Sequence, residues 1–476
     1  MTSSEFYSLI KQQFPFKPTT KQDIVLLQLS EFIFSEVPND LYLLKGYAGT
    51  GKTTIIGTVV SNLWKAKKSA VLMAPTGRAA KVISNYSGKE AFTIHKKIYF
   101  PKKEKSGNVK FVLQPNKHKN TIFIVDEASM IPDAPSESKI FENGSLLDDL
   151  MQYVYSGHKC KLLLIGDTAQ LPPVKLDLSP ALDSNTLSLN YNKVVTKMEL
   201  DEVVRQEQDS GILENATILR ESLSNAFFDT FKFNLKDYKD IVRLIDGQEI
   251  MDAINDSYSQ LGNEETAIIV RSNKRANLYN EQIRNRILFN ENELTSGDYL
   301  MVVKNNYFWI KPTTEAGFIA NGDIIEVLEI FNIIELYNFR FAEVKIRMVD
   351  YPKMRPFETV LLLDTISAET PSLTYEDSNR LYQEVMKDYE DETSNYKKFL
   401  SVKNNKHFNA LQVKFSYAIT CHKSQGGQWN TVFVEQPYLP EGITKDYLRW
   451  LYTAVTRAKE KLYLIGFKDD FFEEEF

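Results

Sequence analysis

Between Gly46 and Thr53 the chain places three glycines close to a lysine and a threonine, in the order Gly-Tyr-Ala-Gly-Thr-Gly-Lys-Thr. The spacing fits the pattern G-x-x-x-x-G-K-[ST], in which a glycine loop points backbone N–H groups at phosphates and a helix begins directly behind it. A chance turn with a lysine is the alternative, but an apolar run at 41–44 and a helical pattern from 53 to about 64 flank the loop. We therefore expect a nucleoside triphosphate to contact Gly46, Ala48, Gly49, Thr50, Gly51, Lys52, Thr53 and Thr54.

A pair of carboxylates, Asp126 and Glu127, follows the apolar run 121–125, which is typical of a buried strand. Thr53 and Asp126 would hold Mg²⁺, Asp126 through the water shell, because Mg²⁺ prefers oxygen ligands and keeps several waters. Glu127 would orient and deprotonate the water that attacks the γ-phosphate, and Lys52 would reach the β- and γ-phosphates. The alternative for the two carboxylates is a capping pair at the start of a helix.

Four further side chains are candidates for the same site. Gln170 follows the apolar run 161–165 and would sense the γ-phosphate or position water, although it also suits a turn before two prolines. Arg205 and Arg457 would stabilise the charge on the phosphoryl oxygens in the transition state, which accelerates transfer about 10³–10⁵-fold. Surface salt bridges are the more usual use of arginine, so this role requires two halves that face each other. Gln22 has the donors and the acceptor that suit adenine.

The elements that must position these residues form two similar halves. In the first, buried apolar runs alternate with helical stretches, which predicts a parallel α/β sheet with ligands beyond the carboxyl ends of its strands. Apolar runs at 266–270 and 431–434 repeat the pattern without a second glycine loop. Two insertions interrupt the halves: a β-hairpin between 95 and 121, and short alternating strands at 324–412 that predict a small barrel.

Composition limits the class of protein. The chain has 476 residues, 43% of them hydrophobic and 25% charged, which is typical of about two to four globular domains. Only two cysteines argue against a disulfide framework or a cysteine zinc site. No membrane-length apolar run or signal-peptide core is present, so we expect a soluble, cytoplasmic protein. The net charge of −6 is uneven, because residues 96–119 hold eight lysines against one glutamate; these form either a phosphate-binding patch or a solvated loop.

Polar residues at other predicted strand ends offer hydroxyls and cations to a polymer with a phosphate backbone. Four aromatic side chains, Phe92, Tyr99, Phe100 and Trp429, offer faces for stacking unpaired bases, although aromatic residues more often belong to a core. The nucleic-acid contacts that we expect are Pro75, Thr76, Thr93, His95 and Phe100 in the first half and Thr420, His422 and Lys423 in the second.

Eight ordered motifs carry a resemblance to a known family: GYAGTGKT, APTGRAAK, FTIH, IVDEAS, GDTAQLPPV, VVRQ, AITCHKSQGGQW and LYTAVTRA. They resemble the motifs of superfamily 1 helicases, and the forms HKSQG and TAVTRA resemble the RecD/Dda group, superfamily 1B. The resemblance covers about residues 19–466 and implies 5′→3′ translocation on single-stranded DNA. It also implies a strand-separating hairpin near 100–112 and an SH3-like insertion. By the same resemblance, Gln22 contacts adenine, Lys52 and Thr53 serve phosphate and Mg²⁺, and Asp126 and Glu127 are catalytic. Arg205 and Arg457 are the arginine fingers, which stabilise charge in the transition state.

We accordingly expect an α/β fold, a P-loop NTPase of two RecA-like parallel-sheet lobes. Lobe 1 would comprise residues 1–95 and 121–188, with the hairpin insertion at 96–120. Lobe 2 would comprise residues 189–323 and 413–476, with an SH3-like β-barrel insertion at 324–412 that includes a charged helical stretch.

The function we infer first is an ATP-dependent 5′→3′ DNA helicase with ATP and Mg²⁺ as cofactors. Its partners would be single-stranded DNA and junctions of single strand with duplex, and it would act as a monomer without membrane contact. One alternative is a DNA-stimulated ATPase that translocates without unwinding by itself, within a recombination or repair complex. Another is a nucleotide-switched module whose insertion binds protein partners. RNA also stays open as the track, because phosphate contacts barely distinguish the sugars.

Overall fold

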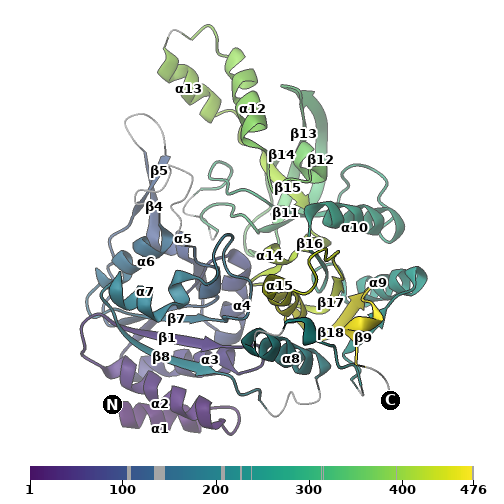
Figure 1. Ribbon diagram of the computed structural model, residues 1–476. Coiled ribbons are helices and arrows are strands. Elements are labelled where there is room, and N and C mark those ends of the chain that lie inside the picture. Colours follow the sequence, from purple (N-terminus) through teal and green to yellow (C-terminus); the bar gives the residue numbers. More distant parts are fainter. Residues whose placement is uncertain are drawn as a thin grey trace.

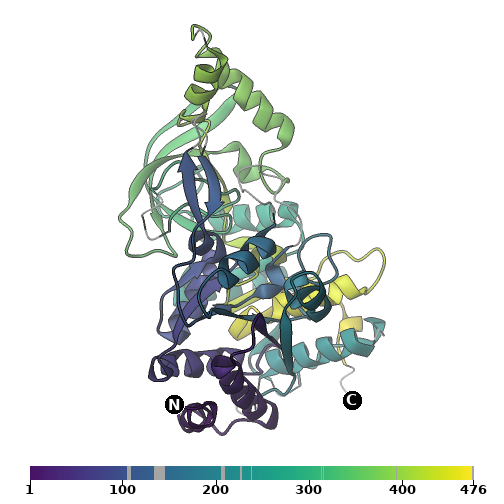
Figure 2. The same cartoon turned by 90° about the vertical axis from the view of Figure 1, so that its left-hand side faces the viewer.

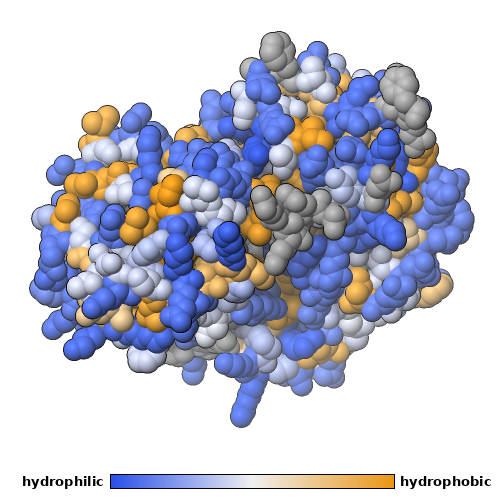
Figure 3. Space-filling model, turned by 90° about the horizontal axis from the view of Figure 1, so that it is seen from below, coloured by the Kyte–Doolittle hydropathy of each residue, from blue (hydrophilic) through white to orange (hydrophobic). Residues whose placement is uncertain are grey.

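The computed structural model describes residues 1–103, 109–132, 145–204, 210–225, 228–236, 238–311, 314, 316–392 and 394–473. Two α/β lobes lie side by side; a hairpin rises from the first, and a β-barrel with two helices rises from the second (Figure 1). Figure 2 shows the hairpin and the barrel on the same side of the molecule. Seen from below, the surface is mostly hydrophilic with scattered apolar side chains (Figure 3), and no described helix is long and apolar enough to span a membrane.

Lobe 1 is built on a six-stranded sheet in the order β3-β2-β6-β7-β1-β8, in which every strand pair is parallel. Strands β1, β6 and β7 are buried along almost their whole length, as continuous apolar runs require. Helices α1–α4 pack on one face of the sheet and α5–α7 on the other. The elements are α1 Ser3–Gln12, α2 Thr20–Phe34, β1 Asp40–Gly46, α3 Lys52–Asn62, β2 Ser69–Ala74, α4 Gly77–Ser87, β3 Ala91–Thr93, α5 Ile94–Ile98, β6 Thr121–Val125, α6 Leu146–Tyr155, β7 Lys161–Gly166, α7 Ser184–Leu189 and β8 Val194–Leu200.

Lobe 2 repeats this plan with a five-stranded parallel sheet in the order β16-β10-β17-β18-β9. Helices α9 and α10 pack on one face, and α8 and α15 on the other. The elements are α8 Gly211–Asn225, β9 Ile241–Leu244, α9 Gly247–Leu261, β10 Thr266–Val270, α10 Asn273–Arg286, β16 Ala418–Thr420, α14 Cys421–Ser424, β17 Trp429–Glu435, α15 Lys445–Val455 and β18 Ala458–Ile465.

Both insertions are present as β structures. The hairpin pairs β4 Tyr99–Lys103 with β5 Val109–Leu113, and its turn lies outside the described residues. Five strands form a closed barrel, which confirms the prediction of a small barrel. The barrel and its helices are β11 Tyr299–Val302, β12 Ile324–Leu336, β13 Phe339–Met348, β14 Phe357–Leu362, α11 Asp364–Ser367, α12 Tyr375–Lys387, α13 Asn395–Lys403 and β15 Leu411–Phe415.

The predicted bounds of two segments differ from those in the structure. Strand β8 pairs with β1, so the sheet of lobe 1 extends to Leu200 and does not end at 188. The barrel recruits β11 and β15 as well as the strands of the insertion, so it begins at Tyr299 and ends at Phe415. The reason is the same in both cases. An apolar alternation predicts a strand but does not specify the neighbour with which the strand forms hydrogen bonds.

A buried ion pair ties the barrel to lobe 2. Asp298, directly before β11, accepts two hydrogen bonds from Arg284 of α10 at 3.0 and 2.9 Å. It also accepts one from the Thr295 N–H at 2.7 Å and one from the Tyr417 hydroxyl at 3.0 Å. Buried charges are tolerated when they are paired and their remaining lone pairs are hydrogen-bonded. The pair therefore determines where the chain leaves lobe 2 for the barrel.

Replacing Asp298→Ala would leave Arg284 buried and unpaired, so we expect the free energy of unfolding to fall by about 3–5 kcal/mol. Urea unfolding followed by circular dichroism measures this change. The matched control is Asp377→Ala, which breaks the exposed pair with Arg380 and should cost less than about 1 kcal/mol. Equal losses in the two variants would contradict the structural role of the buried pair.

Candidate nucleotide site at the lobe interface

The glycine loop joins the carboxyl end of β1 to the start of α3. Gly49 and Gly51 have φ angles of +71° and +82°, a region that residues with a Cβ rarely adopt. A Cβ on Gly51 would also lie 2.4 Å from the side-chain nitrogen of Gln22. Lys52 Nζ donates to two carbonyl oxygens of the loop, at 2.7 and 2.6 Å. The loop therefore combines a lysine ammonium with the positive end of a helix dipole, the arrangement that binds phosphates.

Asp126 and Glu127 follow β6, beside the glycine loop. Asp126 Oδ2 accepts a hydrogen bond from the Tyr86 hydroxyl at 2.7 Å, and Oδ1 accepts one from the Glu127 N–H at 2.9 Å. Glu127 has a φ of +53°, an uncommon conformation for a residue other than glycine. Burial raises the pKa of the Glu127 carboxyl, and the positive charges of Arg457 and Lys52 oppose that rise. A carboxylate with a raised pKa suits a general base.

Lobe 2 completes the site through the residues that follow α15. Arg457 is only 3% exposed and donates to the carbonyl oxygens of Thr453 and Gly427 at 2.9 and 3.2 Å. It lines the same cleft as the glycine loop, and its positive charge opposes the rise in the pKa of Glu127, so the two side chains lie near each other across the cleft. Gln170 also lines the cleft, and its buried Oε1 has no hydrogen-bond partner among the described residues. Because an unpaired buried acceptor costs about 1–3 kcal/mol, a donor in the cleft would be favoured there.

Tyr452 of α15 links the two lobes directly. Its hydroxyl accepts a hydrogen bond from the Ala48 N–H of the glycine loop at 3.0 Å and donates one to Asp167 Oδ2 at 2.7 Å. Gln425 of lobe 2 donates to the carbonyl oxygen of Leu171 at 2.7 Å. Sequence reasoning assigns no role to Tyr452 or Asp167. Their contact joins segments far apart in the chain, so no local pattern predicts it. The one sequence signal for these two residues is that they lie inside the motifs LYTAVTRA and GDTAQLPPV.

These groups surround a cleft of about 910 Å³ between the lobes. Gly46 and Gln22 are not among its lining residues. Gln22 is buried and donates to the Thr50 carbonyl oxygen at 3.0 Å, so an adenine contact requires it to exchange partners and stays a prediction. Arg205 lies outside the described residues, and its role also stays a prediction. The predicted residues that line the cleft are Ala48, Gly49, Thr50, Gly51, Lys52, Thr53, Thr54, Asp126, Glu127, Gln170 and Arg457.

The predicted nucleic-acid contacts follow strands at one end of each sheet. Thr76 follows β2 and the half-buried Pro75, and its side-chain oxygen caps helix α4. Thr93 ends β3, and its side-chain oxygen caps helix α5. Thr420 ends β16 of lobe 2. A Cβ on Gly426 would lie 3.1 Å from Thr76 Oγ1, so the segments from the two lobes adjoin.

Burial lowers the pKa of some of these candidates. It lowers the pKa of His95 to about 4, which favours a neutral ring at physiological pH. His422 is exposed, and burial lowers the pKa of Lys423 to about 8. Contacts of all three with nucleic acid stay predictions.

Two of the four aromatic side chains predicted to stack on bases are buried instead. Tyr99 is 7% exposed and donates to Asp149, and Trp429 is 3% exposed with the Arg78 guanidinium 4.0 Å from its ring. Their prediction as stacking faces is wrong, because tertiary packing covers both rings. Phe100, on β4, is 39% exposed and keeps an accessible face.

Two protein-family models match this chain. One, described as an AAA domain, matches residues 30–176, which include the glycine loop, both carboxylates and Gln170. The other, described as a UvrD-like helicase C-terminal domain, matches residues 415–465, which include Arg457. The two matches occur in the order expected for lobe 1 and lobe 2.

Several proteins are similar over long stretches. The ATP-dependent DNA helicase dda of Enterobacteria phage T4 is 27% identical over 60% of this chain and 62% of its own length. The RecBCD enzyme subunit RecD of Buchnera aphidicola is 25% identical over 91% of this chain and 71% of its own length. The chain is related to the RecD/Dda group of superfamily 1B helicases.

Two further matches cover nearly all of this chain. An uncharacterized protein of Acanthamoeba polyphaga mimivirus is 24% identical over 93% of this chain and 98% of its own length. The crystal structure of Pif1 helicase from Candida albicans aligns with a TM-score of 0.43 and 17% identity, over 96% of this chain and 97% of that chain.

Arg457→Ala should reduce the turnover number for ATP by about 10²–10³-fold, because a charge aimed at the transition state acts mainly on kcat. Nucleotide affinity should change by less than about threefold. Steady-state hydrolysis and fluorescent-nucleotide titration measure the two quantities. Arg457→Lys keeps the charge without the planar fork and should recover only some of the rate.

The control for this prediction is Arg243→Ala. It removes another arginine of lobe 2 that donates to a backbone carbonyl oxygen, that of Phe467, but does not line the cleft. Its turnover should stay near that of the unmodified chain. Equal losses of turnover and affinity in Arg457→Ala would indicate a structural role for Arg457.

Proposed function

We propose that the chain is an ATP-dependent DNA helicase that moves 5′→3′ along single-stranded DNA and separates duplex strands. One observation carries the proposal: the nucleotide cleft is completed from both lobes, with Lys52 on one side and Arg457 on the other. A nucleotide that bridges two lobes can change how they sit relative to each other, which is what a translocating motor requires. The relationship to the RecD/Dda group supports DNA as the track and 5′→3′ as the direction.

In this proposal lobe 1 supplies the phosphate-binding and basic groups. Lys52 and the loop amides bind the β- and γ-phosphates, and Glu127 orients and deprotonates the attacking water. Arg457 of lobe 2 neutralises charge on the transferred phosphoryl group. Gln170, with its unpaired Oε1, accepts a hydrogen bond from the attacking water.

The residues present also fit Mg²⁺. The Thr53 hydroxyl and the Asp126 carboxylate are the hard oxygen donors that Mg²⁺ prefers, and both line the cleft beside Tyr86, whose hydroxyl donates to Asp126. When bound, Mg²⁺ would neutralise charge on the β- and γ-phosphates. Thr53 and Asp126 would hold it, Asp126 through water.

Single-stranded DNA would cross the ends of both sheets. Thr76 and Thr93 on lobe 1, and Thr420, His422 and Lys423 on lobe 2, would contact its backbone, which carries no sequence information. Because Thr76 adjoins Gly426 of lobe 2, a change in the angle between the lobes alters the spacing of the two sets of contacts. Alternate closing and opening would therefore advance the strand.

The hairpin packs against the segment between β11 and β12 of the barrel, which supports a strand-separating role. Phe111 of β5 is buried, and its ring centroid lies 4.5 Å from that of Tyr307 and 6.5 Å from that of Phe318. Both partners belong to the segment between β11 and β12. Such aromatic pairs contribute about 0.5–1.5 kcal/mol each beyond the area they bury. A hairpin held from both sides can separate the strands of a duplex without bending away.

The remaining proposals follow from the family resemblance. We propose that Gln22 contacts adenine once it releases Thr50, and that Arg205 is a second arginine finger. We further propose that the barrel is SH3-like, that protein partners would bind at 324–412, and that the chain acts as a monomer.

Duplexes with a single-stranded tail test the function and its direction together. With ATP and Mg²⁺, the chain should displace the strand of a duplex with a 5′ tail and leave a duplex with a 3′ tail intact. A gel or fluorescence assay of strand displacement measures this, with Lys52→Ala as the control for ATP dependence. Displacement from the 3′ tail alone would contradict the proposed polarity.

Shortening the hairpin separates translocation from unwinding. Deleting residues 102–110 and joining 101 to 111 through two glycines removes the outer paired rungs and keeps Tyr99 opposite Leu113. We expect strand displacement to fall at least about tenfold while DNA-stimulated hydrolysis stays within about twofold. Undiminished displacement would contradict the role of the hairpin. An intact chain with DNA-stimulated hydrolysis but no displacement would instead favour a translocase that needs partners.

A further inference from the structure

Tyr86 is a residue of α4 to which sequence reasoning gives no role. Its hydroxyl donates a hydrogen bond to Asp126 Oδ2 at 2.7 Å and lies near the Thr53 side chain. These two side chains are the oxygen donors that fit Mg²⁺. A tyrosine hydroxyl is protonated at neutral pH, so it serves as a hydrogen-bond donor to the Asp126 carboxylate.

The other end of α4 lies where DNA is proposed to bind. Thr76 caps the helix by accepting a hydrogen bond from the Ala79 N–H at 3.2 Å. A Cβ on Gly426 would lie 2.8 Å from Ala79 Cβ, so the first turn of α4 packs tightly against lobe 2. Helix α4 therefore connects the loop at Thr76, where DNA is proposed to bind, to the Asp126 carboxylate in the nucleotide cleft.

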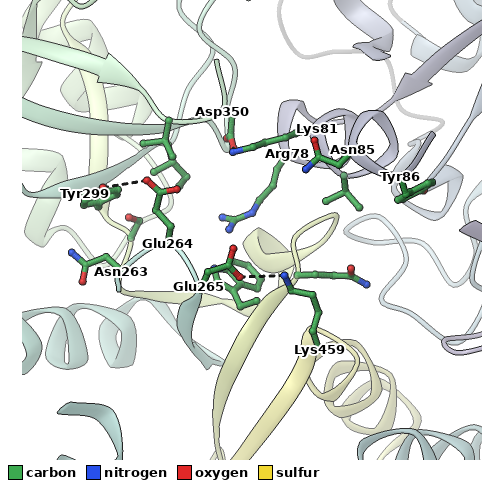
Figure 4. Close-up of a pocket in the computed structure, with 16 residues that line it drawn as sticks. Arg78, Lys81, Asn85, Tyr86, Asn263, Glu264, Glu265, Tyr299, Asp350 and Lys459 are labelled. Atoms are coloured by element: carbon green, nitrogen blue, oxygen red, sulfur yellow. Dashed lines mark hydrogen bonds and ion pairs between the residues drawn. The ribbon is translucent and has the colours of Figure 1, made fainter. Parts of the chain in front are cut away.

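Two further residues of α4, Arg78 in the first turn and Lys81 in the second, contact lobe 2 and the barrel. The Arg78 guanidinium lies 4.0 Å from the centre of the Trp429 ring, and Lys81 Nζ lies 3.5 Å from Asp350 Oδ1. Figure 4 shows Arg78, Lys81 and Tyr86 along α4 at one side of a cavity, with residues of lobe 2 and the barrel opposite. A movement of lobe 2 relative to lobe 1 thus acts on α4 at several points along its length.

We propose that Tyr86 is a positioning residue that holds Asp126 and Thr53 in the arrangement that binds Mg²⁺, and that α4 makes this arrangement respond to single-stranded DNA at Thr76. The second half of this inference rests on the proposed function; the first half does not. A helix of eleven residues moves as a unit, and hydrogen bonds weaken steeply when their angle changes. A small displacement at Thr76 would therefore alter the bond between Tyr86 and Asp126.

The test is Tyr86→Phe, which removes the hydroxyl and keeps the ring. The affinity for a fluorescent ADP is measured as Mg²⁺ is varied, with and without a thymidine oligonucleotide. Partners of metal ligands typically change metal affinity about 10–100-fold, so the half-saturating Mg²⁺ concentration should rise by at least about tenfold in the variant. The oligonucleotide should shift that concentration in the unmodified chain and should not shift it in Tyr86→Phe.

Tyr417→Phe is the matched control, because its hydroxyl also donates to a buried aspartate, Asp298, at 3.0 Å, but outside the cleft. It should lower the melting temperature and leave the Mg²⁺ dependence unchanged. An unchanged Mg²⁺ dependence in Tyr86→Phe, or an equal shift in both variants, would overturn the positioning role.

A DNA response that persists in Tyr86→Phe, or that is absent from the unmodified chain, would overturn the coupling through α4. The two proposals fail separately. If single-stranded DNA does not stimulate hydrolysis by the unmodified chain, the proposed function is wrong, while the Mg²⁺ titration without DNA still decides the role of Tyr86.

Discussion

The packing of the two lobes against each other depends on charged side chains that are buried where the lobes meet. Burial raises the pKa of the Glu127 and Asp167 carboxyls of lobe 1, and Arg457 of lobe 2 is buried as well. An unpaired ion in this region costs on the order of several kcal/mol. Arg457 and Lys52 offset that cost only when they lie beside the carboxylates. The hydroxyl of Tyr452 sets the spacing by bonding to both the glycine loop and Asp167. Neither lobe is a complete site alone.

The parallel sheets divide this interface into two zones. All carboxyl ends of a parallel sheet point the same way, so the central strands β1, β6 and β7 deliver residues of the cleft, while β2, β3 and β16 lead to the proposed polymer contacts. Helix α4 spans the two zones, from Thr76 to Tyr86. The insertions leave the lobes on one side, where Phe111 of the hairpin packs against the barrel and Asp298 anchors the barrel to lobe 2.

Much of the fold and of the nucleotide site follows from the sequence alone. Continuous apolar runs predicted the buried parallel strands, and the spacing of Gly46, Gly51 and Lys52 predicted the loop at the end of the first strand. Asp126 and Arg457 also lie in the cleft where their motifs placed them. These features are predictable because each depends on residues next to one another in the chain, where strand burial, glycine conformation and helix start are decided locally.

Other features were decided by contacts between segments far apart in the chain. Strands β8 and β11 took neighbours that no apolar pattern identifies. Trp429 is buried beneath Arg78, Gln22 is bonded to the glycine loop, and the hydroxyls of Tyr86 and Tyr452 join carboxylates on distant strands. The sequence by itself determined two parallel-sheet lobes and a phosphate loop. Only the tertiary structure decided which side chains complete the site, because burial and hydrogen-bond partners exist only once the lobes have packed together.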